Sequence, residues 1–126
     1  MSQLAPITPS LGWHRFEHKN LEITVVDADG EPQTLTGIAL SWKLLHHGTA
    51  LITKTDQDGI TLDTSDSVGA INDIAVIEIE ETEYVYDEED GTSEVPAGIY
   101  RHELWDTDSD VLLSYGDVHL LPGNAP

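Results

Sequence analysis

The stretch Gly-Ile-Tyr-Arg-His-Glu-Leu-Trp at residues 98–105 decides the fold class of this chain. Tyr100 and Leu104 lie an even number of positions apart, which is the period-two pattern of a β-strand with one face in a core. The alternation turns the other large or charged side chains to the opposite face, namely Ile99, Arg101, Glu103 and Trp105. An outward Trp beside an Arg is typical of protein interfaces, so Arg101 and Trp105 are predicted to be contact residues.

The neighbouring segments continue the same pattern. Asp-Thr-Asp-Ser-Asp at 106–110 predicts a hairpin turn into a last strand over 111–115 and 118–121. Further upstream, apolar residues at every second position predict strands over 21–25, 38–44, 50–54, 60–62 and 73–80, the last of them central. No long window has the apolar spacing of a helix. The chain is therefore predicted to be all-β, an antiparallel β-sandwich of about seven or eight strands, with a small barrel as the alternative.

Residues 81–96 form an acidic segment between two predicted strands. The segment is longer than the usual hairpin loop, and it carries seven Asp and Glu residues. It is predicted to be either a functional loop or an extended hairpin around Tyr84 and Tyr86. Its tip, Asp-Glu-Glu-Asp-Gly at 87–91, is expected to face water.

The first 19 residues are predicted to form an extended N-terminal arm, followed by a single domain over 20–126. The arm carries two prolines and ends in Trp-His-Arg-Phe-Glu-His-Lys at 13–19, where aromatic and basic residues cluster. Trp13, Arg15 and Phe16 are therefore predicted to be contact residues. Two arrangements remain open, since the arm could lie back on its own domain or reach into a neighbouring subunit.

The charge of the chain limits its partners. The 24 Asp and Glu against 5 Lys and Arg give a formal net charge of -19, which excludes a nucleic-acid binder that neutralises phosphates and disfavours an anionic membrane surface. The 39% of hydrophobic residues still suffices for a core, so the acids are expected at its surface. This composition is typical of proteins adapted to high salt, and the alternative is charge that keeps the protein soluble or meets a basic partner.

Location signals are also absent from the sequence. The first ten residues lack the basic start and apolar run of a secretion signal. The longest aliphatic stretch, 74–77, is far too short to span a bilayer, and there is no cysteine to report a redox compartment. A soluble protein is expected.

No motif indicates catalysis or a cofactor. Asp106, Asp108 and Asp110 have calcium-loop spacing, but Val111 stands where that loop needs glycine. A His-Glu pair at 102–103 lacks the second histidine of a zinc protease, and the adjacent histidines at 46–47 point apart on a strand or lie in a turn. We therefore expect no enzyme, no cofactor and no metal site.

The order of several short segments supports a more specific assignment. An Asp-Ala-Asp-Gly turn at 27–30 is followed by Leu-Thr-Gly at 35–37, then Trp42, then Asp-Gly-Ile at 58–60 and finally Ala-Gly-Ile-Tyr-Arg-His-Glu-Leu at 97–104. This order resembles the small immunoglobulin-like domains in virion proteins of tailed viruses, such as the N-terminal domain of the siphophage baseplate upper protein. The resemblance covers about residues 20–121. It implies an immunoglobulin-like β-sandwich and a non-enzymatic, structural role on a virus particle.

The resemblance further implies many copies in a symmetric homo-oligomer, with the major capsid protein or other virion proteins as partners. The implied location is the virion, assembled in the host cytoplasm. Because the chain lacks the long C-terminal region of baseplate upper proteins, a capsid decoration or turret subunit is favoured over a tail or baseplate component. Another alternative is a receptor- or carbohydrate-binding module that uses Trp105, Tyr84 and Tyr86 as exposed aromatics.

Overall fold

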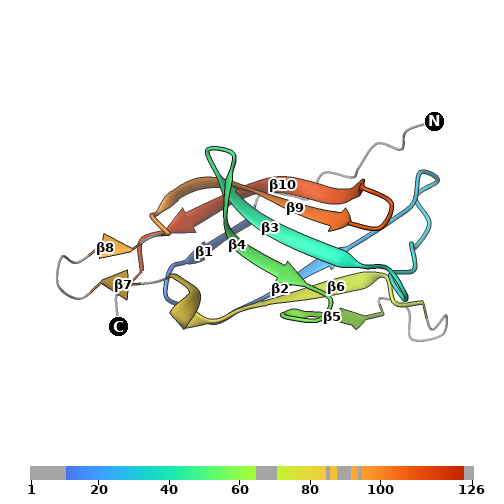
Figure 1. Cartoon of the computed structure of the whole chain (residues 1–126), viewed down its shortest axis with the longest axis horizontal. Helices are drawn as coiled ribbons and strands as arrows, with labels where there is room; N and C mark the ends of the chain where they lie inside the picture. The colour runs from blue at the N-terminus through green and yellow to red at the C-terminus, as the bar shows by residue number, and fades with distance from the viewer. Residues whose placement is uncertain (1–10, 65–70, 85, 88–91, 94, 124–126) are drawn as a thin grey trace.

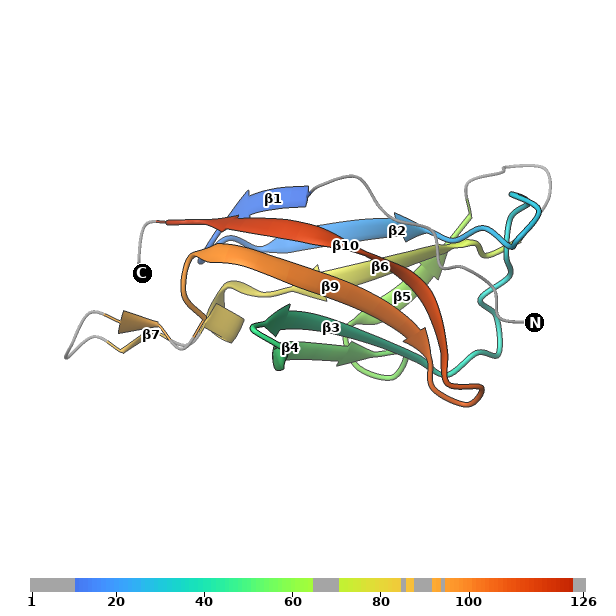
Figure 2. The ribbon, with the colours of Figure 1, turned by 90° about the horizontal axis from the view of Figure 1, so that it is seen from above.

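The fold consists of two β-sheets packed as layers, which Figures 1 and 2 show in two views. The computed structural model describes residues 11–64, 71–84, 86–87, 92–93 and 95–123. One sheet has five strands in the order β1-β10-β9-β3-β4, and the other has three in the order β2-β6-β5. In chain order the elements are β1 (Leu11–His14), β2 (Lys19–Thr24), β3 (Leu40–His46), β4 (Thr49–Thr55), β5 (Ile60–Asp63), β6 (Ile74–Ile79), η1 (Glu81–Tyr84), β7 (Tyr86–Asp87), β8 (Thr92–Ser93), β9 (Gly98–Asp106) and β10 (Val111–Leu121).

The predicted all-β sandwich is confirmed. Strand neighbours are antiparallel except β1 and β10, which run parallel. The only helix in the described part of the chain is the single 3-10 turn η1. No ladder of hydrogen bonds between described strands joins the two sheets, so the alternative of a closed barrel is not observed.

Alternate residues of the strands fill the space between the sheets. In β6, Ala75, Ile77 and Ile79 are fully buried, and β6 lies between β2 and β5, so its predicted central position is confirmed. Trp42 in β3 is fully buried as well. Its indole Nε1 donates a hydrogen bond of 3.3 Å to Nδ1 of His102, a second fully buried ring. The apolar core therefore includes a hydrogen-bonded pair of buried rings.

Tight turns join neighbouring strands where the sequence predicts them. His47 and Gly48 connect β3 to β4 with φ angles of 51° and 83°, and two successive positive φ angles give the turn whose twist matches paired strands. Before β10, a side-chain oxygen of Asp106 accepts hydrogen bonds from the amides of Asp108 and Ser109 at 3.1 and 3.2 Å. These turns fix the register of β3 with β4 and of β9 with β10.

The acidic segment after β6 takes the hairpin form. The chain passes through η1 and then forms the antiparallel pair of β7 and β8, which lies at one end of the molecule in Figure 1. Residues 88–91, at the predicted tip, lie outside the described residues.

The predicted arm does not extend to residue 19. Residues 1–10 lie outside the described part, but Leu11–His14 form β1, an integral strand of the five-stranded sheet, and Lys19 begins β2. Trp13 pairs with Leu120 of β10 and buries its indole in the core. For residues 11–19 the chain therefore lies back on its own domain, because burial of one large aromatic favours sheet pairing over extension into solvent.

An ion pair joins β4 to η1. Lys54 Nζ lies 2.5 Å from Glu83 Oε2, and Lys54 is only 8% exposed. The same Glu83 oxygen accepts the amide of Glu80 at 2.8 Å. Gly59, at the end of the turn before β5, lies directly against the Lys54 side chain.

Changing Gly59 to alanine is expected to destabilise the protein more than changing Gly30 to alanine. Both glycines have positive φ, at 97° and 81°, so both variants incur about 1–2 kcal/mol of backbone strain. Only at Gly59 would the new Cβ overlap the Lys54 side chain, since Gly30 faces open space. We expect Gly59→Ala to lose about 1 kcal/mol more in urea unfolding. Equal losses would contradict the packing of Lys54 against this turn.

Candidate functional site: the outer face of the five-stranded sheet

The candidate site is the face of the five-stranded sheet that is turned away from the three-stranded sheet, and we call it the outer face. β9 lies between β10 and β3 in this sheet, and its inward residues Tyr100, His102 and Leu104 are buried. The alternation predicted from the sequence is thus confirmed. On β9 the outer face carries Ile99, Arg101, Glu103 and Trp105.

These residues differ in how far they are exposed. Ile99 is 64% exposed, the highest value among the exposed large hydrophobic residues of the described chain. Arg101 is exposed, and Trp105 is half-buried. The structure therefore brings the predicted contact residues Arg101 and Trp105 to one surface, with an exposed aliphatic side chain beside them.

Glu103 holds Arg101 and Trp105 in place. One carboxylate oxygen accepts a hydrogen bond of 2.6 Å from Arg101 Nε, and the other accepts one of 3.0 Å from Trp105 Nε1. The carboxylate thus fixes a guanidinium on one side and an indole on the other. This organising role is not visible in the sequence, where Glu103 is one of 24 acids.

The environment of Glu103 favours its charged form. Partial burial acts to raise the pKa of Glu103, but hydrogen bonds from Trp105 and Arg101 and the charges of Arg101 and Lys43 lower it more, so its pKa lies below the ordinary value. Glu103 therefore remains a carboxylate at neutral pH and keeps its two hydrogen bonds.

Cross-strand neighbours extend this network onto β3 and β10. Lys43 and Tyr115 are both register partners of Glu103, one on each side. The Arg101 guanidinium carbon lies 4.4 Å from the centroid of the Tyr115 ring, within the range of a cation-π contact. The outer face therefore presents Trp, Tyr and Arg side chains together, and register is what brings Tyr115 and Lys43 to them.

A hollow of about 460 Å³ lies beside this network. Its lining comes from the β3–β4 turn and from β9 and β10, and it includes Leu45, Gly48, Ile99, Arg101 and Asp117. Apolar side chains and charges of both signs border the same space. Such a surface suits a protein side chain that brings both apolar contact and hydrogen bonds.

The other three predicted contact residues form a separate cluster at the end of the sandwich. Trp13 Nε1 donates a hydrogen bond of 2.7 Å to the hydroxyl of Tyr84, and the Phe16 and Tyr84 rings meet edge to face at 5.7 Å. Arg15 lies over Phe16 at 5.0 Å and donates from Nη1 to the carbonyl of Val95 at 3.3 Å. These contacts tie the N-terminal segment to the acidic segment of the same chain.

Trp13 is predicted from the sequence to be a contact residue between molecules, and its burial in the core of its own chain corrects that prediction. Its side chain is 4% exposed, because β1 pairs with β10 and turns the indole toward Tyr84. Arg15 and Phe16 are half-buried. The aromatic and basic residues of 13–16 are thus engaged within the chain.

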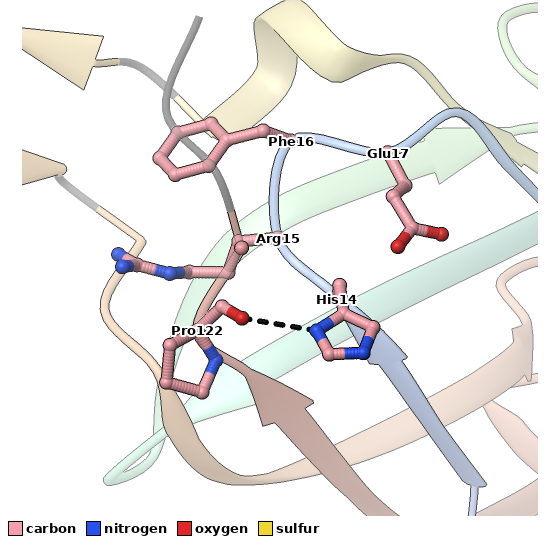
Figure 3. A pocket seen from close by; sticks show the side chains of 6 residues that line it. His14, Arg15, Phe16, Glu17 and Pro122 are labelled. Carbon is pink, nitrogen blue, oxygen red and sulfur yellow. Dashed lines mark hydrogen bonds between the residues drawn. The ribbon is translucent and has the colours of Figure 1, made fainter.

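A second hollow, of about 400 Å³, borders this cluster and is shown in Figure 3. His14 Nδ1 and the carbonyl oxygen of Pro122 lie 2.9 Å apart across it. Arg15 and Phe16 extend together to one side, away from His14 and Glu17 (Figure 3). The Arg15 Nε is buried and has no hydrogen-bond partner in the described part of the chain. Beside this hollow, the amide of Arg15 donates a hydrogen bond of 2.9 Å to the carbonyl of Leu121 at the end of β10.

The exposed aromatic set expected for carbohydrate binding is not present as predicted. Tyr84 is fully buried, with its hydroxyl 3.3 Å from the carbonyl of Glu17, and burial is the main cause that raises its pKa. The side chain of Tyr86 lies outside the described side chains. Trp105 remains accessible, but Tyr84 cannot stack on a sugar in this structure.

Comparison with protein families and with curated proteins does not identify the site. A scan against models of protein families finds no match to this chain, and a search of curated proteins finds none either. Among the described residues, no group of three or more His, Asp or Glu side chains is arranged to hold a metal ion. The described helical residues also contain no segment long and apolar enough to cross a membrane.

Proposed function

We propose that this chain is an immunoglobulin-like domain that works by protein-protein contact, as a non-enzymatic structural component of the virion of a tailed virus. Within that class we favour a capsid decoration or turret subunit. Its partners would be the major capsid protein or other virion proteins, within a symmetric assembly. The virion setting rests on the resemblance in segment order over residues 20–121.

Strand order supports the immunoglobulin-like assignment. In that fold one sheet contains strands B, E and D, and the other contains G, F and C with an added strand beside C in the variable type. The sheets β2-β6-β5 and β10-β9-β3-β4 have the same succession of strands. Two features differ from the constant type: β4 is the strand added beside β3, and β1 pairs with β10 instead of β2.

Two side chains further support the immunoglobulin-like assignment. Trp42 is buried on β3, where immunoglobulin domains carry their core tryptophan. Tyr100, near the start of β9, donates a hydrogen bond of 2.6 Å from its hydroxyl to the carbonyl of Pro96 four residues upstream, which is the geometry of a tyrosine corner. His102 follows two residues later, where antibody domains have their second cysteine, and it packs against Trp42.

The observation that carries the assembly role is the network on the outer face. Trp, Tyr and Arg dominate binding energy at protein interfaces, and Trp105, Tyr115 and Arg101 are adjacent here. Because Glu103 and Tyr115 already hold Arg101 in one arrangement, little side-chain freedom is lost when a partner binds.

The virion role is tested by quantitative mass spectrometry of density-purified particles from the source organism. The protein is compared with the major capsid protein of the same particles. Tens to hundreds of copies per particle are expected for a shell component. A handful of copies would move it to the tail or baseplate, and its absence from particles would contradict the proposal.

Replacing Trp105 by alanine tests the outer face as the contact surface. We expect at least a tenfold loss of affinity for purified particles stripped of this protein, because truncation of an anchoring Trp commonly costs 2 kcal/mol or more, at about 1.4 kcal/mol per tenfold change. The matched control is Leu62→Ala on β5, an exposed apolar residue of the other sheet. Normal decoration by the Trp105 variant would reject this face as the contact.

A further inference from the structure

The outer edge of β4 carries backbone groups that are free to pair. β4 is the last strand of the five-stranded sheet. The amide of Asp56 donates to Leu40 on the β3 side, whereas Thr55 exchanges both of its backbone hydrogen bonds with Asp58 on the other side. Since successive residues of a strand direct their backbone groups to opposite sides, the amide and carbonyl of Thr53 point away from β3, as those of Thr55 do.

At Thr53 this edge is open to pairing. In the described part of the chain, no backbone partner is found for the outward amide and carbonyl of Thr53. In natural proteins, charges, prolines or bulges commonly prevent an edge strand from pairing with another chain. β4 has a register shift near Leu51, but Thr53 beyond it is exposed, uncharged and in regular register with Lys43.

Charge makes β4 the edge at which two copies of this acidic chain can meet. The chain has a formal charge of -19, yet residues 32–55, which include all of β3 and β4, contain no Asp or Glu. The edge strands of the other sheet each carry an acid, Glu22 in β2 and Asp63 in β5. β1 is free of acids but has only four residues. β4 is therefore the edge strand of more than four residues that carries no acid.

We infer that β4 meets β4 of a second copy antiparallel about a two-fold axis at Thr53, so that two five-stranded sheets lie edge to edge through this pair. The amide of each Thr53 then donates to the carbonyl of the other. This contact is the isologous kind that closes a dimer. It does not depend on the virion role or on the outer face.

The symmetric register places compatible side chains opposite one another. Thr53 faces its own copy, and threonine pairs across strands are favourable. Ile52 faces Lys54 on both halves, so no two like charges are directly opposed. Lys54 itself is turned inward and paired with Glu83, so its charge does not lie at the edge.

A charge placed at the axis tests the pairing. Thr53→Glu puts two carboxylates directly opposite each other, whereas Thr61→Glu adds the same charge at an exposed position of β5. By sedimentation in 1 M KCl, where repulsion between chains is screened, we expect a reversible dimer for the wild type and for Thr61→Glu. Thr53→Glu should weaken the dimer at least tenfold even at this salt, because pairing would remove water from two opposed carboxylates, and circular dichroism should show that the variant stays folded.

Cross-linking provides a second measurement that does not rely on weakening the dimer. The chain has no cysteine, so an introduced thiol is unique. Directly opposite residues of an antiparallel hydrogen-bonded pair have Cα atoms about 5.5 Å apart, within the range of a disulfide. Thr53→Cys should form a covalent dimer on mild oxidation, and Thr61→Cys should stay mostly monomeric under the same conditions.

Several results would overturn the pairing. A wild-type protein that stays monomeric at high concentration in 1 M KCl would do so. So would a dimer that survives Thr53→Glu, or equal cross-linking of the two cysteine variants. A dimer that is lost in Trp105→Ala but kept in Thr53→Glu would place the contact on the outer face instead.

Discussion

Replacing Trp13 by alanine is expected to lower the free energy of unfolding by about 3–5 kcal/mol, the range for truncating a buried aromatic side chain. The indole is 4% exposed and belongs to the main hydrophobic core. Its loss leaves a cavity and removes the hydrogen-bond donor to the Tyr84 hydroxyl. β1 should detach from β10, because the four paired residues contribute too little stability by themselves when the buried side chain that anchors the strand is removed.

A double-mutant cycle separates the hydrogen bond from the packing. Trp13→Phe keeps an aromatic ring without the N–H, and Tyr84→Phe removes the acceptor. We expect a coupling between the two of about 1 kcal/mol in urea unfolding, the net worth of one buried hydrogen bond. A loss below about 1 kcal/mol for Trp13→Ala would contradict the anchoring of β1 by Trp13, and residues 11–14 would then belong to the extended arm predicted from the sequence.

The main strands are predictable because their pattern is local. In β6 and β9, apolar residues at every second position mark the buried face, and the structure has the same residues inside. A one-residue shift would turn each such face to water, so the alternation alone determines which side chains point outward. Arg101 and Trp105 were found in this way.

β1 and the outer-face network could not be found by the same reasoning. Leu11–His14 contains too few residues for a periodic signal, and the basic residues that follow it suggested a polar arm. Its placement depends on Tyr84, 71 positions away, which accepts the Trp13 hydrogen bond. Likewise, Tyr115 and Lys43 join Glu103 only through the register of three strands. Long-range pairing is not encoded in any single segment.

His102 should make the protein less stable as the pH falls below neutrality. The ring is fully buried, and burial, with a smaller contribution from the charge of Arg101, lowers the pKa of His102 to about 4 against opposing effects of Glu103 and Asp117. Nδ1 accepts the hydrogen bond from Trp42, so a proton there would displace it. In the unfolded chain the same histidine has an ordinary pKa of about 6.5.

The sign of the effect follows from proton binding. Between pH 6.5 and 4 the unfolded chain holds a proton on His102 that the folded protein does not, so the stabilising contribution is complete above pH 6.5 and is lost on acidification. The slope is about 1.4 kcal/mol per pH unit, or about 2 kcal/mol between pH 6.5 and 5. Most carboxylates are still ionised in that interval, so relief of their mutual repulsion adds little.

Urea unfolding at pH 7, 6 and 5 measures this loss, and nuclear magnetic resonance of the histidine rings should show one that titrates near pH 4. His102→Asn keeps an acceptor near the position of Nδ1 but cannot take up the proton. Because the side chain is smaller, we expect a lower free energy of unfolding at pH 7, and the part of the pH dependence that His102 causes should disappear. His47→Gln, at an exposed turn, removes a histidine without removing that slope. An unchanged pH dependence in His102→Asn would contradict a neutral His102 in the core, and so would a wild-type spectrum in which every histidine titrates above pH 6.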